Sequence, residues 1–398
     1  MKAFAAKTSV FLFLLYMYWY SVAYRDVQLF LYGITLLMVV TTAIYVDHRP
    51  LSSIVPPKGI LFWVAFGIYS LLTGLVVASN RSLLVSSIVT YMAFLIVCWC
   101  ICIICRGEKD IQWLLKCISI VCYVCAAYTL LFGESNGKYI SMGAENNPNS
   151  LGVLMVYGMF SVLYNKKRKV GELLWMLASM LLFFYVIILT GSRKSLLSGV
   201  LLCAVWLITL IRDTRKLTDR KEKTLKYALM IATLVVCVTY FTKEYVNTGS
   251  FQRMQVLFKD TSSSKRMGMY KEAIELFKTS KLFGIGFNQF RVRSSFGSYS
   301  HSTYAEVPAS GGIFGCIVFF YPIIKTGIVL MKKLGKNPSY QLGMLFALLL
   351  VELLLATGMI FVYSFGHLLI WSILYMTTEN ALLVGAENPD RGESLCQK

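Results

Sequence analysis

The sequence is poor in charged residues. Asp, Glu, Lys and Arg make up only 15% of its 398 residues, whereas 57% are hydrophobic. Soluble domains contain roughly a quarter charged residues. This shortage excludes an ordinary water-soluble domain, because lipid rather than water must solvate most of the chain.

Several common catalytic signatures are also missing. The chain has no Asp-x-Asp pair that would hold a nucleotide sugar through a divalent metal, no phosphate-binding glycine loop and no Gly-x-Ser-x-Gly elbow. Its three histidines, His48, His301 and His367, show no metal-ligand spacing. We therefore expect no bound metal and no cofactor.

Cysteine is present, but its placement argues against metal or disulfide chemistry. The chain has 11 cysteines, and all but Cys396 lie in or at the ends of apolar stretches. A buried free cysteine behaves as a small hydrophobic side chain. We interpret these residues as packing between helices.

Long apolar stretches dominate the sequence. A bilayer core needs roughly 17 to 25 apolar residues per helix, and about twelve stretches qualify. An all-α polytopic membrane protein is therefore expected, with spans at Ser9–Ala23, Val27–Val46, Ile60–Ala78, Leu83–Cys105, Ile111–Phe132, Ser150–Tyr164, Leu173–Thr190, Ser195–Ile211, Leu225–Phe241, Ile313–Leu330, Tyr340–Ala356 and Met359–Tyr375.

The basic residues predict the orientation of these spans. Cytoplasmic loops are enriched in Lys and Arg, and this pattern places both termini in the cytoplasm. The first stretch is expected to be a retained helix rather than a signal peptide. The net charge of +19 is then an orientation and membrane-surface signal, so nucleic acid is not an expected partner.

One connection is much longer than the others. Residues 242–312 would form an extracytoplasmic loop between spans in 1–241 and spans in 313–376, with a cytoplasmic tail in 377–398. Loops of this length are usually functional or disordered. The spacing of Met267, Tyr270, Ile274 and Phe277 predicts an amphipathic helix, so we expect this loop to carry the chemistry.

Two outer arginines are candidates for binding phosphate. Arg193 lies in a tight turn between two spans, and Arg266 begins the amphipathic helix and shares a side with Tyr270. A guanidinium matches phosphate oxygens with two parallel hydrogen bonds. The alternatives are an interfacial anchor for Arg193 and a solvated loop residue for Arg266.

Four further residues carry polar groups on the outer side. His301 has an imidazole suited to general-base catalysis, and Glu306 could orient it. Asn147 and Asn149 precede a span, where Asn149 or Ser150 could cap the helix. Alternatively, these amides would bind a polyhydroxyl ligand. Two outer arginines at headgroup level favour a lipid-linked phosphate or diphosphate as substrate.

Four stretches resemble motifs of the bacterial O-antigen polymerases and O-antigen ligases. They are Asn147-Pro148-Asn149-Ser150-Leu151-Gly152, Leu189-Thr190-Gly191-Ser192-Arg193-Lys194-Ser195, Ser264-Lys265-Arg266 followed by Gly284-Ile285-Gly286 and Phe290, and His301-Ser302-Thr303-Tyr304-Ala305-Glu306. The resemblance covers roughly residues 143–315. Ser302 stands where many members have Asn, and Pro308 interrupts the segment after Tyr304.

The resemblance implies a glycosyltransferase C-like membrane fold and a metal-independent, inverting glycosyl transfer. A glycan chain would move from an undecaprenyl pyrophosphate carrier to a lipid-linked repeat unit at the outer side of the bacterial cytoplasmic membrane. Arg193 and Arg266 would hold the pyrophosphate, His301 would act on the acceptor, and Tyr270, Tyr304 and Glu306 would contact substrate. A flippase and a chain-length regulator are implied partners. Ligation to another acceptor and transport of the lipid-linked unit remain alternatives.

Overall fold

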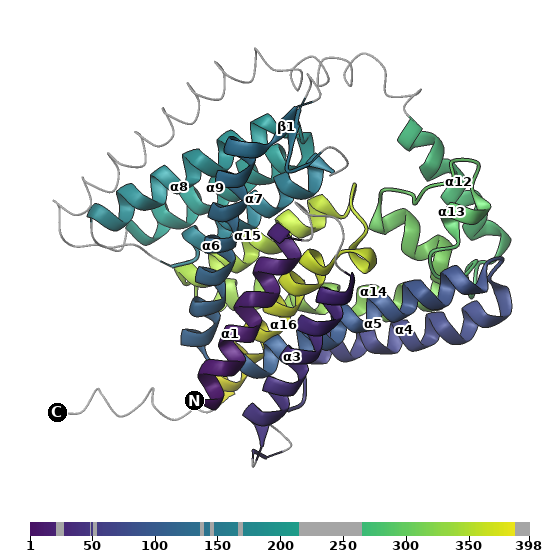
Figure 1. The fold of residues 1–398 in the computed structure, drawn as a ribbon, viewed down its shortest axis with the longest axis horizontal. Coiled ribbons are helices and arrows are strands. Elements are labelled where there is room, and N and C mark those ends of the chain that lie inside the picture. The colour runs from purple at the N-terminus through teal and green to yellow at the C-terminus, as the bar shows by residue number, and fades with distance from the viewer. Residues whose placement is uncertain are drawn as a thin grey trace.

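The computed structural model describes residues 1–20, 28–47, 49–50, 54–135, 139–143, 147–165, 170–214 and 265–386. Almost all of them are helical (Figure 1). The helices are α1 (Lys2–Leu15), the π-helix η1 (Tyr16–Tyr20), α3 (Gln28–Val46), α4 (Lys58–Val77), α5 (Arg81–Ile104), α6 (Glu108–Phe132), α7 (Pro148–Leu163), α8 (Val170–Leu189), α9 (Arg193–Thr214), α12 (Lys265–Thr279), α13 (Phe290–Arg293), α14 (Thr303–Lys336), α15 (Tyr340–Leu355), the 3₁₀ helix η3 (Phe361–Tyr363) and α16 (Phe365–Ala386). Strands β1 (Glu134–Ser135) and β2 (Ile140–Ser141) pair antiparallel.

The helices agree with the predicted spans. Each span predicted within the described residues overlaps a helix, and six helices, α4, α5, α6, α8, α9 and α14, are long and apolar enough to cross a membrane. The ninth span, Leu225–Phe241, lies outside the described residues, so the total of about twelve stays a prediction. The chain is a helical membrane protein.

The last span differs from its predicted position. We expected Met359–Tyr375, but α16 begins only at Phe365, after the short helix η3, and continues to Ala386. His367, which the sequence placed deep in the span, therefore lies in the first turn of α16. Hydropathy missed this boundary because residues 359–364 are as apolar as the helix that follows them.

Side-chain caps determine where several helices begin. Asn80 caps α5 by accepting a hydrogen bond from Leu83 N at 2.9 Å, and Ser339 caps α15 through Leu342 N at 3.2 Å. Such caps replace the hydrogen bonds that the first turn of a helix cannot make internally. Helix ends are thus set by single polar residues between long apolar runs.

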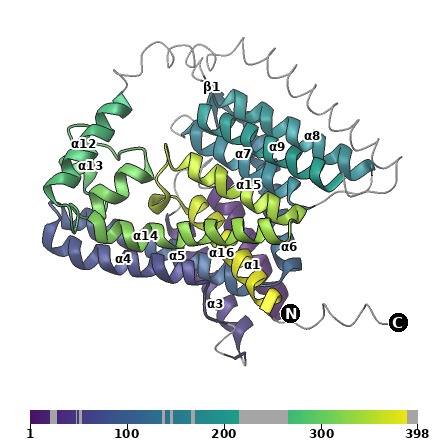
Figure 2. The ribbon, with the colours of Figure 1, turned by 180° about the vertical axis from the view of Figure 1, so that it is seen from behind.

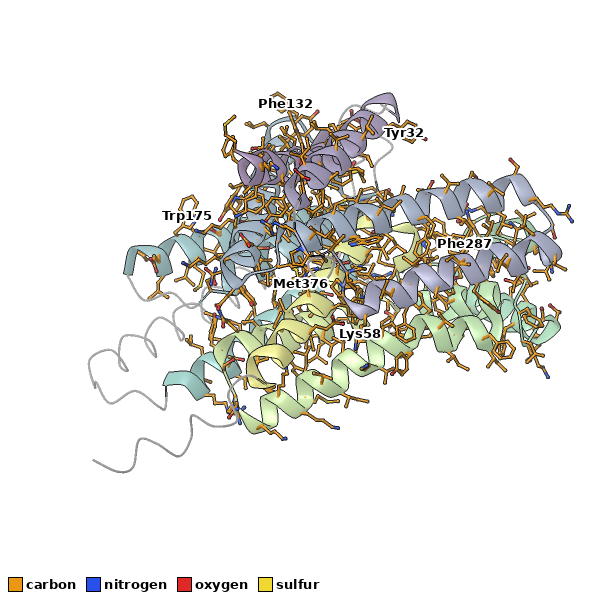
Figure 3. All side chains as sticks on the ribbon, turned by 90° about the horizontal axis from the view of Figure 1, so that it is seen from below. Tyr32, Lys58, Phe132, Trp175, Phe287 and Met376 are labelled. Atoms are coloured by element: carbon orange, nitrogen blue, oxygen red, sulfur yellow. The ribbon has the colours of Figure 1, made fainter. Side chains whose placement is uncertain are left out.

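The outer surface of the helices is strongly apolar. Figure 3 labels Tyr32, Phe132 and Trp175 at the edge of the molecule, where 67%, 67% and 64% of their surfaces are exposed. Phe287, by contrast, is buried among the helices. Large exposed apolar side chains on many helices fit a surface that faces lipid.

One face of the molecule collects the helix ends that we predicted to be cytoplasmic. Five polar contacts on this face join helix ends that are distant in the sequence. They are Lys2 with Asp47, Lys7 with Asp110, Lys58 N with Glu379, Gln341 with Glu108, and Lys333 with the carbonyl of Thr378. These contacts bring the predicted cytoplasmic ends of α1, α3, α4, α6, α14, α15 and α16 to one face. Which compartment this face meets remains a prediction.

Helix α14 is broken near its beginning, and the glycine-rich stretch fills the break. Gly312 leaves the helical conformation with φ 63°, so the helix cannot complete its own hydrogen bonds there. The amide of Ile285 donates to the carbonyl of Ala309 at 2.9 Å, and the amide of Ile313 donates to the carbonyl of Lys281 at 2.8 Å. A Cβ on Gly284 would lie 2.4 Å from the backbone of Ser310, so this contact requires glycine. The stretch after α12 is thereby locked onto α14 (Figure 2).

Candidate active site

Four segments meet at the end of the bundle opposite the predicted cytoplasmic face. They are the beginning of α9, the beginning of α12, the residues just before α14, and the connection between α15 and α16. Three of the four are helix amino termini or precede one, where unpaired amide N–H groups and the helix dipole favour an anion. Basic side chains at the same positions reinforce this preference.

The turn before α9 is held by close packing against α7. Gly191 has φ 63°, and the hydroxyl groups of Ser192 and Ser195 lie 2.8 Å apart. A Cβ on Gly152 of α7 would lie 2.7 Å from Ser195 Oγ, so glycine allows the two helices to approach here. Two of the motifs noted in the sequence therefore pack against each other. This contact fixes the first residue of α9, Arg193.

Lys194 follows Arg193 and reaches the connection between α15 and α16. A Cβ built on Gly358 would overlap the ammonium nitrogen of Lys194, which shows that the lysine lies against the Gly358 backbone. The charges of Arg266 and Arg193 both act on Lys194. Lys194 therefore connects α9 electrostatically to the beginning of α12.

Helix α12 confirms the predicted amphipathic helix. Met269 and Ala273 point inward, whereas Met267 and Ile274 are exposed. The inward pair packs with Ile285, Phe290 and Ala309. Apolar side chains therefore occur on both sides of this short helix, and tertiary contacts hold the inner side.

Tyr270 ties α12 to the same connection that Lys194 touches. Its hydroxyl donates to the carbonyl of Thr357 at 2.8 Å. Arg266 is one turn earlier on the same side of α12, close enough for its charge to act on Tyr270. Thr357 and Gly358 are thus contacted from α12 and α9, respectively.

His301 lies in a strained backbone position before α14. Its φ of 59° is uncommon for a residue with a Cβ, and its ring centroid lies 4.3 Å from that of Tyr299. Burial, together with the positive charges of Arg266, Lys194 and Lys265, lowers the pKa of His301 to about 4. The imidazole is therefore neutral at physiological pH, and four basic or imidazole side chains share one small region.

The residues after His301 anchor it to the α15–α16 connection. The amide of Thr303 donates to the carbonyls of Ala356 and Met359 at 2.9 and 3.0 Å, and its hydroxyl donates to Met359 O at 2.8 Å. Ser302 Oγ donates to Ala356 O at 3.3 Å. This network supplies the tertiary support that a strained residue needs.

Glu306 and Tyr304 have other partners than those we expected. The carboxylate of Glu306 is buried and accepts hydrogen bonds from the amide of Ser300 at 2.9 Å and the hydroxyl of Tyr363 at 3.0 Å, rather than from His301. The Tyr304 hydroxyl donates to the carbonyl of Leu353 at 3.0 Å. In this structure both side chains hold the segment before α14 in place.

Asn147 has the capping role that we expected for Asn149 or Ser150, and its binding of a polyhydroxyl ligand stays a prediction. Its side chain caps α7, accepting from Asn149 N at 3.0 Å and from Asn149 Nδ2 at 2.9 Å, so the cap is Asn147 rather than Asn149 or Ser150. Asn147 also lines a cavity of about 280 Å³ that reaches inward to His367. The partner amide Asn149 is occupied by the cap.

The stretch around Gln289 has a structural role. Gln289 is fully buried, and its amide accepts from Asn80 N at 2.8 Å and donates to Asn80 O at 3.0 Å. Arg293 donates to Ser79 Oγ at 2.9 Å. These contacts fasten the segment after α12 to the turn between α4 and α5.

Sequence reasoning missed two components of the site. Lys194 and Lys265 each stand next to an arginine that we had selected, and both act on His301. The Thr357–Gly358 turn belongs to a distant part of the chain and has no motif that would reveal it. The sequence did contain a signal for the two lysines. Each forms a pair of adjacent basic residues, Arg193-Lys194 and Lys265-Arg266, on the predicted outer side, where basic residues are scarce.

The described residues contain no group of three metal-binding side chains. All nine cysteines that the structure describes are free thiols.

Comparison with known proteins identifies the segment that carries this site. No curated protein matches the chain. Residues 177–320 match the family model described as O-antigen ligase, and this range contains Arg193, Arg266 and His301. Over these residues, which carry the candidate site, the chain is therefore similar to the O-antigen ligase family.

Proposed function

We propose that this protein is a polysaccharide repeat-unit polymerase. It would transfer a glycan chain from an undecaprenyl pyrophosphate carrier to the non-reducing sugar of a second lipid-linked unit. The observation that carries the proposal is a basic cluster within the segment that matches the O-antigen ligase family. Arg266, Lys194 and Lys265 act on His301, and Arg193 acts on Lys194. A diphosphate has the charge that such a cluster requires.

The geometry supports a division of roles at the site. The two guanidinium groups would bind the diphosphate and stabilise the charge that develops as the bond from the anomeric carbon to the phosphate oxygen breaks. His301 is neutral and able to accept the proton of the acceptor hydroxyl. The acceptor oxygen would form the new bond to the anomeric carbon, and a single displacement would invert that centre.

Substrate binding would also improve His301 as a base. Three nearby cations lower its pKa in the free protein. A bound diphosphate would offset these charges and raise the pKa of His301 toward its ordinary value, because opposite charges nearby favour the protonated ring. His301 would then accept a proton more readily when the lipid diphosphate donor of the glycan is bound. The positive charge of the cluster would stabilise the leaving diphosphate, as a bound metal ion does in other transferases.

Ligation remains the second enzymatic possibility, because the matched family description is itself O-antigen ligase. The two reactions share the donor and differ in the acceptor. Purified protein offered donor together with either a lipid-linked repeat unit or a core glycolipid would distinguish them. Polymer on the first acceptor alone supports the polymerase, whereas product on the second alone would replace it with a ligase.

Transport of the lipid-linked unit is less well supported. Intramembrane charged residues in the middle of the bundle would favour transport. The predicted span Met359–Tyr375 would place His367 near its middle, whereas the structure places it in the first turn of α16. Glu352, its partner, lies in the last turn of α15. Both therefore lie near one end of their helices.

The proposed location of the site can be tested by topology. We propose the bacterial cytoplasmic membrane, with both termini inside and the basic cluster outside. A reporter fused after Lys216 should then read cytoplasmic, and one inserted near Gly297 should read extracytoplasmic. The opposite pair of results would contradict access of an exported lipid-linked substrate to the site.

The substitution His301→Ala tests the reaction itself. Loss of a general base typically lowers the rate by about 10² to 10⁴. Cells should accumulate single repeat units on the lipid carrier, exported but unpolymerised. Polymer length by gel, protein abundance in membranes and the sidedness of the lipid-linked unit would be measured together.

Each alternative gives a different result in that assay. A transporter variant would retain the unit on the cytoplasmic leaflet. A histidine with only a structural role would lower protein abundance together with activity. Long polymer at normal abundance would remove His301 from the reaction.

A further inference from the structure

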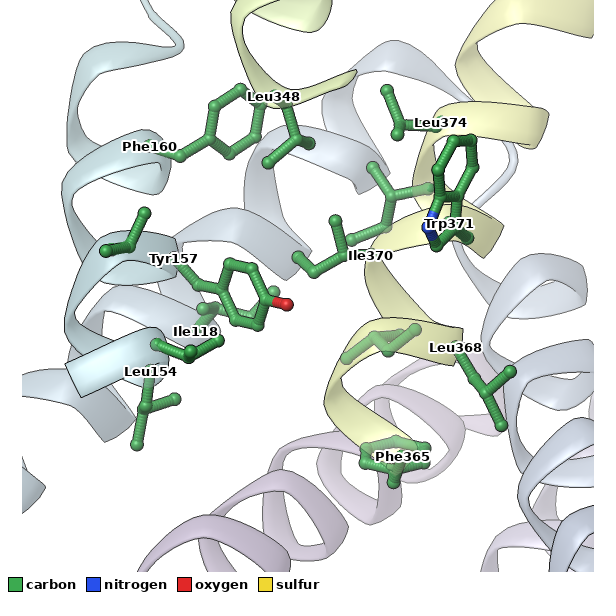
Figure 4. Close-up of a cluster of buried hydrophobic side chains, with 14 of the residues drawn as sticks. Ile118, Leu154, Tyr157, Phe160, Leu348, Phe365, Leu368, Ile370, Trp371 and Leu374 are labelled. Atoms are coloured by element: carbon green, nitrogen blue, oxygen red, sulfur yellow. The ribbon is translucent and has the colours of Figure 1, made fainter. Parts of the chain in front are cut away.

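A second polar centre lies beside the basic cluster, in the interior of the bundle. Tyr157 of α7, Glu352 of α15 and His367 of α16 form a buried network. Figure 4 shows Tyr157 extending from α7 with its hydroxyl on the side of α16. All three residues are at most 2% exposed, so water does not satisfy these groups from the bulk.

The hydrogen bonds of this network determine which nitrogen of His367 carries hydrogen. The Tyr157 hydroxyl donates to Glu352 Oε1 at 2.7 Å, so its oxygen is left to accept from His367 Nδ1 at 2.8 Å. Nδ1 also lies 3.0 Å from Glu352 Oε2. We therefore assign a hydrogen to Nδ1. In the tautomer that carries this hydrogen alone, Nε2 is a hydrogen-bond acceptor.

Nε2 of His367 has no hydrogen-bond partner among the residues that the structure describes. Buried polar nitrogens in proteins nearly always have a partner. His367 and Tyr157 also line the cavity of about 280 Å³ that Asn147 borders. A hydrogen-bond donor inside this cavity would satisfy the ring.

The character of the cavity limits what that donor can be. Its apolar walls come from Leu, Val and Met side chains, its aromatic rings from Tyr18 and Tyr157, and further polar groups from Asn147, Ser150 and Ser364. None of the described residues that line it is Lys or Arg, and a carboxylate stands behind the histidine. An anionic ligand is therefore disfavoured. The volume lies near the lower end of small-molecule sites, roughly 300 to 1,000 Å³.

The cavity adjoins the basic cluster through one short connection. Met359 lines the cavity, and its carbonyl accepts the hydrogen bonds from Thr303, two residues after His301. Phe361 in the same connection donates its amide to Thr303 Oγ1 at 3.1 Å and packs its ring on His367 at 4.6 Å between centroids. A ligand bound in the cavity would thus lie next to the region that holds the diphosphate.

We propose that this cavity is a binding subsite for an uncharged sugar residue, with a sugar hydroxyl donating to Nε2 of His367. The inference deepens the proposed function and rests on it, because the sugar would belong to the glycan that reacts at the neighbouring cluster. Apolar walls, aromatic rings and a few polar groups match the alternating faces of a sugar ring. The basic cluster would bind the charged part of the substrate, and the cavity the neutral part.

The test uses the full chain purified in detergent and methyl glycosides of glucose, galactose, rhamnose and N-acetylglucosamine as probes. Saturation-transfer NMR would measure their binding. His367→Asn keeps an amide N–H near the position of Nδ1 but has no group at Nε2. It should weaken glycoside binding about tenfold, the loss expected for one good hydrogen bond.

A second variant guards against misfolding of the buried network. Ser150 is exposed at the cavity, so Ser150→Trp should narrow the cavity without disturbing the core. It should also weaken glycoside binding about tenfold. Its matched control is Leu197→Trp, an exposed position on α9 outside the cavity, which should leave binding unchanged.

Binding of farnesyl diphosphate, measured on the same proteins, separates this inference from the proposed function. Weak glycoside binding in both variants with diphosphate binding retained supports the subsite. Equal glycoside binding in wild type and both variants overturns it, as does the absence of binding by every glycoside to wild type. Glycoside binding without diphosphate binding would leave the subsite standing and remove the proposed function.

Discussion

Basic side chains are arranged differently at the two ends of the helices. At the predicted cytoplasmic end, lysines meet carboxylates, as Lys2 does with Asp47 at 2.9 Å and Lys7 with Asp110 at 2.6 Å. At the opposite end, Lys194, Lys265 and Arg266 all act on His301, while the carboxylate of Glu306 binds Ser300 and Tyr363.

The difference indicates where an anion is required. Paired charges at a surface are solvated and contribute only about 0 to 1 kcal/mol. Like charges held together raise the energy of the free protein, and such arrangements cluster at functional sites, where a ligand offsets the repulsion. The comparison therefore predicts large effects on activity at one end and small effects at the other.

The largest effect is expected for Arg193→Lys and Arg266→Lys. Lysine keeps the positive charge but loses the planar group that binds two phosphate oxygens together. We expect each variant to lose activity by about 100-fold, as when one preorganised donor is removed from an active site. Product formation from a defined lipid diphosphate donor would be measured, with membrane abundance scored in parallel.

The control for these variants is Arg106→Lys at the opposite end. Arg106 donates to the carbonyl of Val55, and a lysine can replace that contact. It should keep full activity. Equal losses in all three variants would mean that the guanidinium groups serve folding or insertion at both ends, and the contrast between the ends would disappear.

A smaller effect is expected for Gly358→Ala. The new methyl group would occupy the position of the Lys194 ammonium group and displace it from the cluster. We expect about a tenfold loss of activity, the consequence of one displaced charge–ligand contact worth about 1.4 kcal/mol. The loss should match that of Lys194→Ala in the same assay.

The double variant makes this prediction specific. If Gly358→Ala acts only by moving Lys194, it should cause no further loss once Lys194 is already alanine. Additive losses would instead show that the turn is damaged in its own right. Melting temperatures of the three variants would reveal such damage.

The sequence predicted the helices well because bilayer thickness imposes a length on every apolar run. The predicted start of the last span was wrong for a related reason. Residues 359–364 are apolar but fold into a connection, since their backbone hydrogen bonds go to Thr303 and to a 3₁₀ turn. Hydropathy does not distinguish a buried connection from a helix.

The site was only partly predictable. We could select Arg193, Arg266 and His301 because basic residues are rare in extracytoplasmic loops, so those that occur there are candidates for function. The structure brings Arg266 and His301 together. Glu306 was expected to face His301, and its actual partner Tyr363 belongs to a connection distant in sequence. The Tyr157–Glu352–His367 network depends on three helices, so only packing reveals it.

The pH dependence sharpens the comparison further. Burial and neighbouring cations lower the pKa of His301 to about 4, so the proton-accepting form persists as the pH falls through 6.5. The ratio kcat/KM reports the free enzyme, and it should therefore stay level down to about pH 5. Lys265→Gln removes one of the cations, so the acidic limb should move toward higher pH by a fraction of a unit.

An ordinary acidic limb near pH 6.5 in wild type would contradict this electrostatic account. If the acidic limb of the kcat/KM profile is unchanged in Lys265→Gln, then Lys265 does not influence the pKa of His301. The profile of kcat should lie at higher pH than that of kcat/KM, because bound diphosphate offsets the cations and raises the pKa of His301.

The smallest effect is expected for Lys7→Gln at the predicted cytoplasmic end. The pair with Asp110 is close, but both side chains are about 30% exposed, and such pairs contribute no more than about 1 kcal/mol. Activity should equal that of wild type, and the melting temperature should fall by only a few degrees. The matched variant at the other end is Lys194→Gln, which removes the same charge from a lysine that acts on His301. Its melting temperature should hold or rise, because repulsion from Arg193 and Arg266 is relieved, while its activity falls. If Lys7→Gln instead loses activity as Lys194→Gln does, loss of activity does not distinguish the two ends of the helices. The assignment of the basic cluster as the active site would then be wrong.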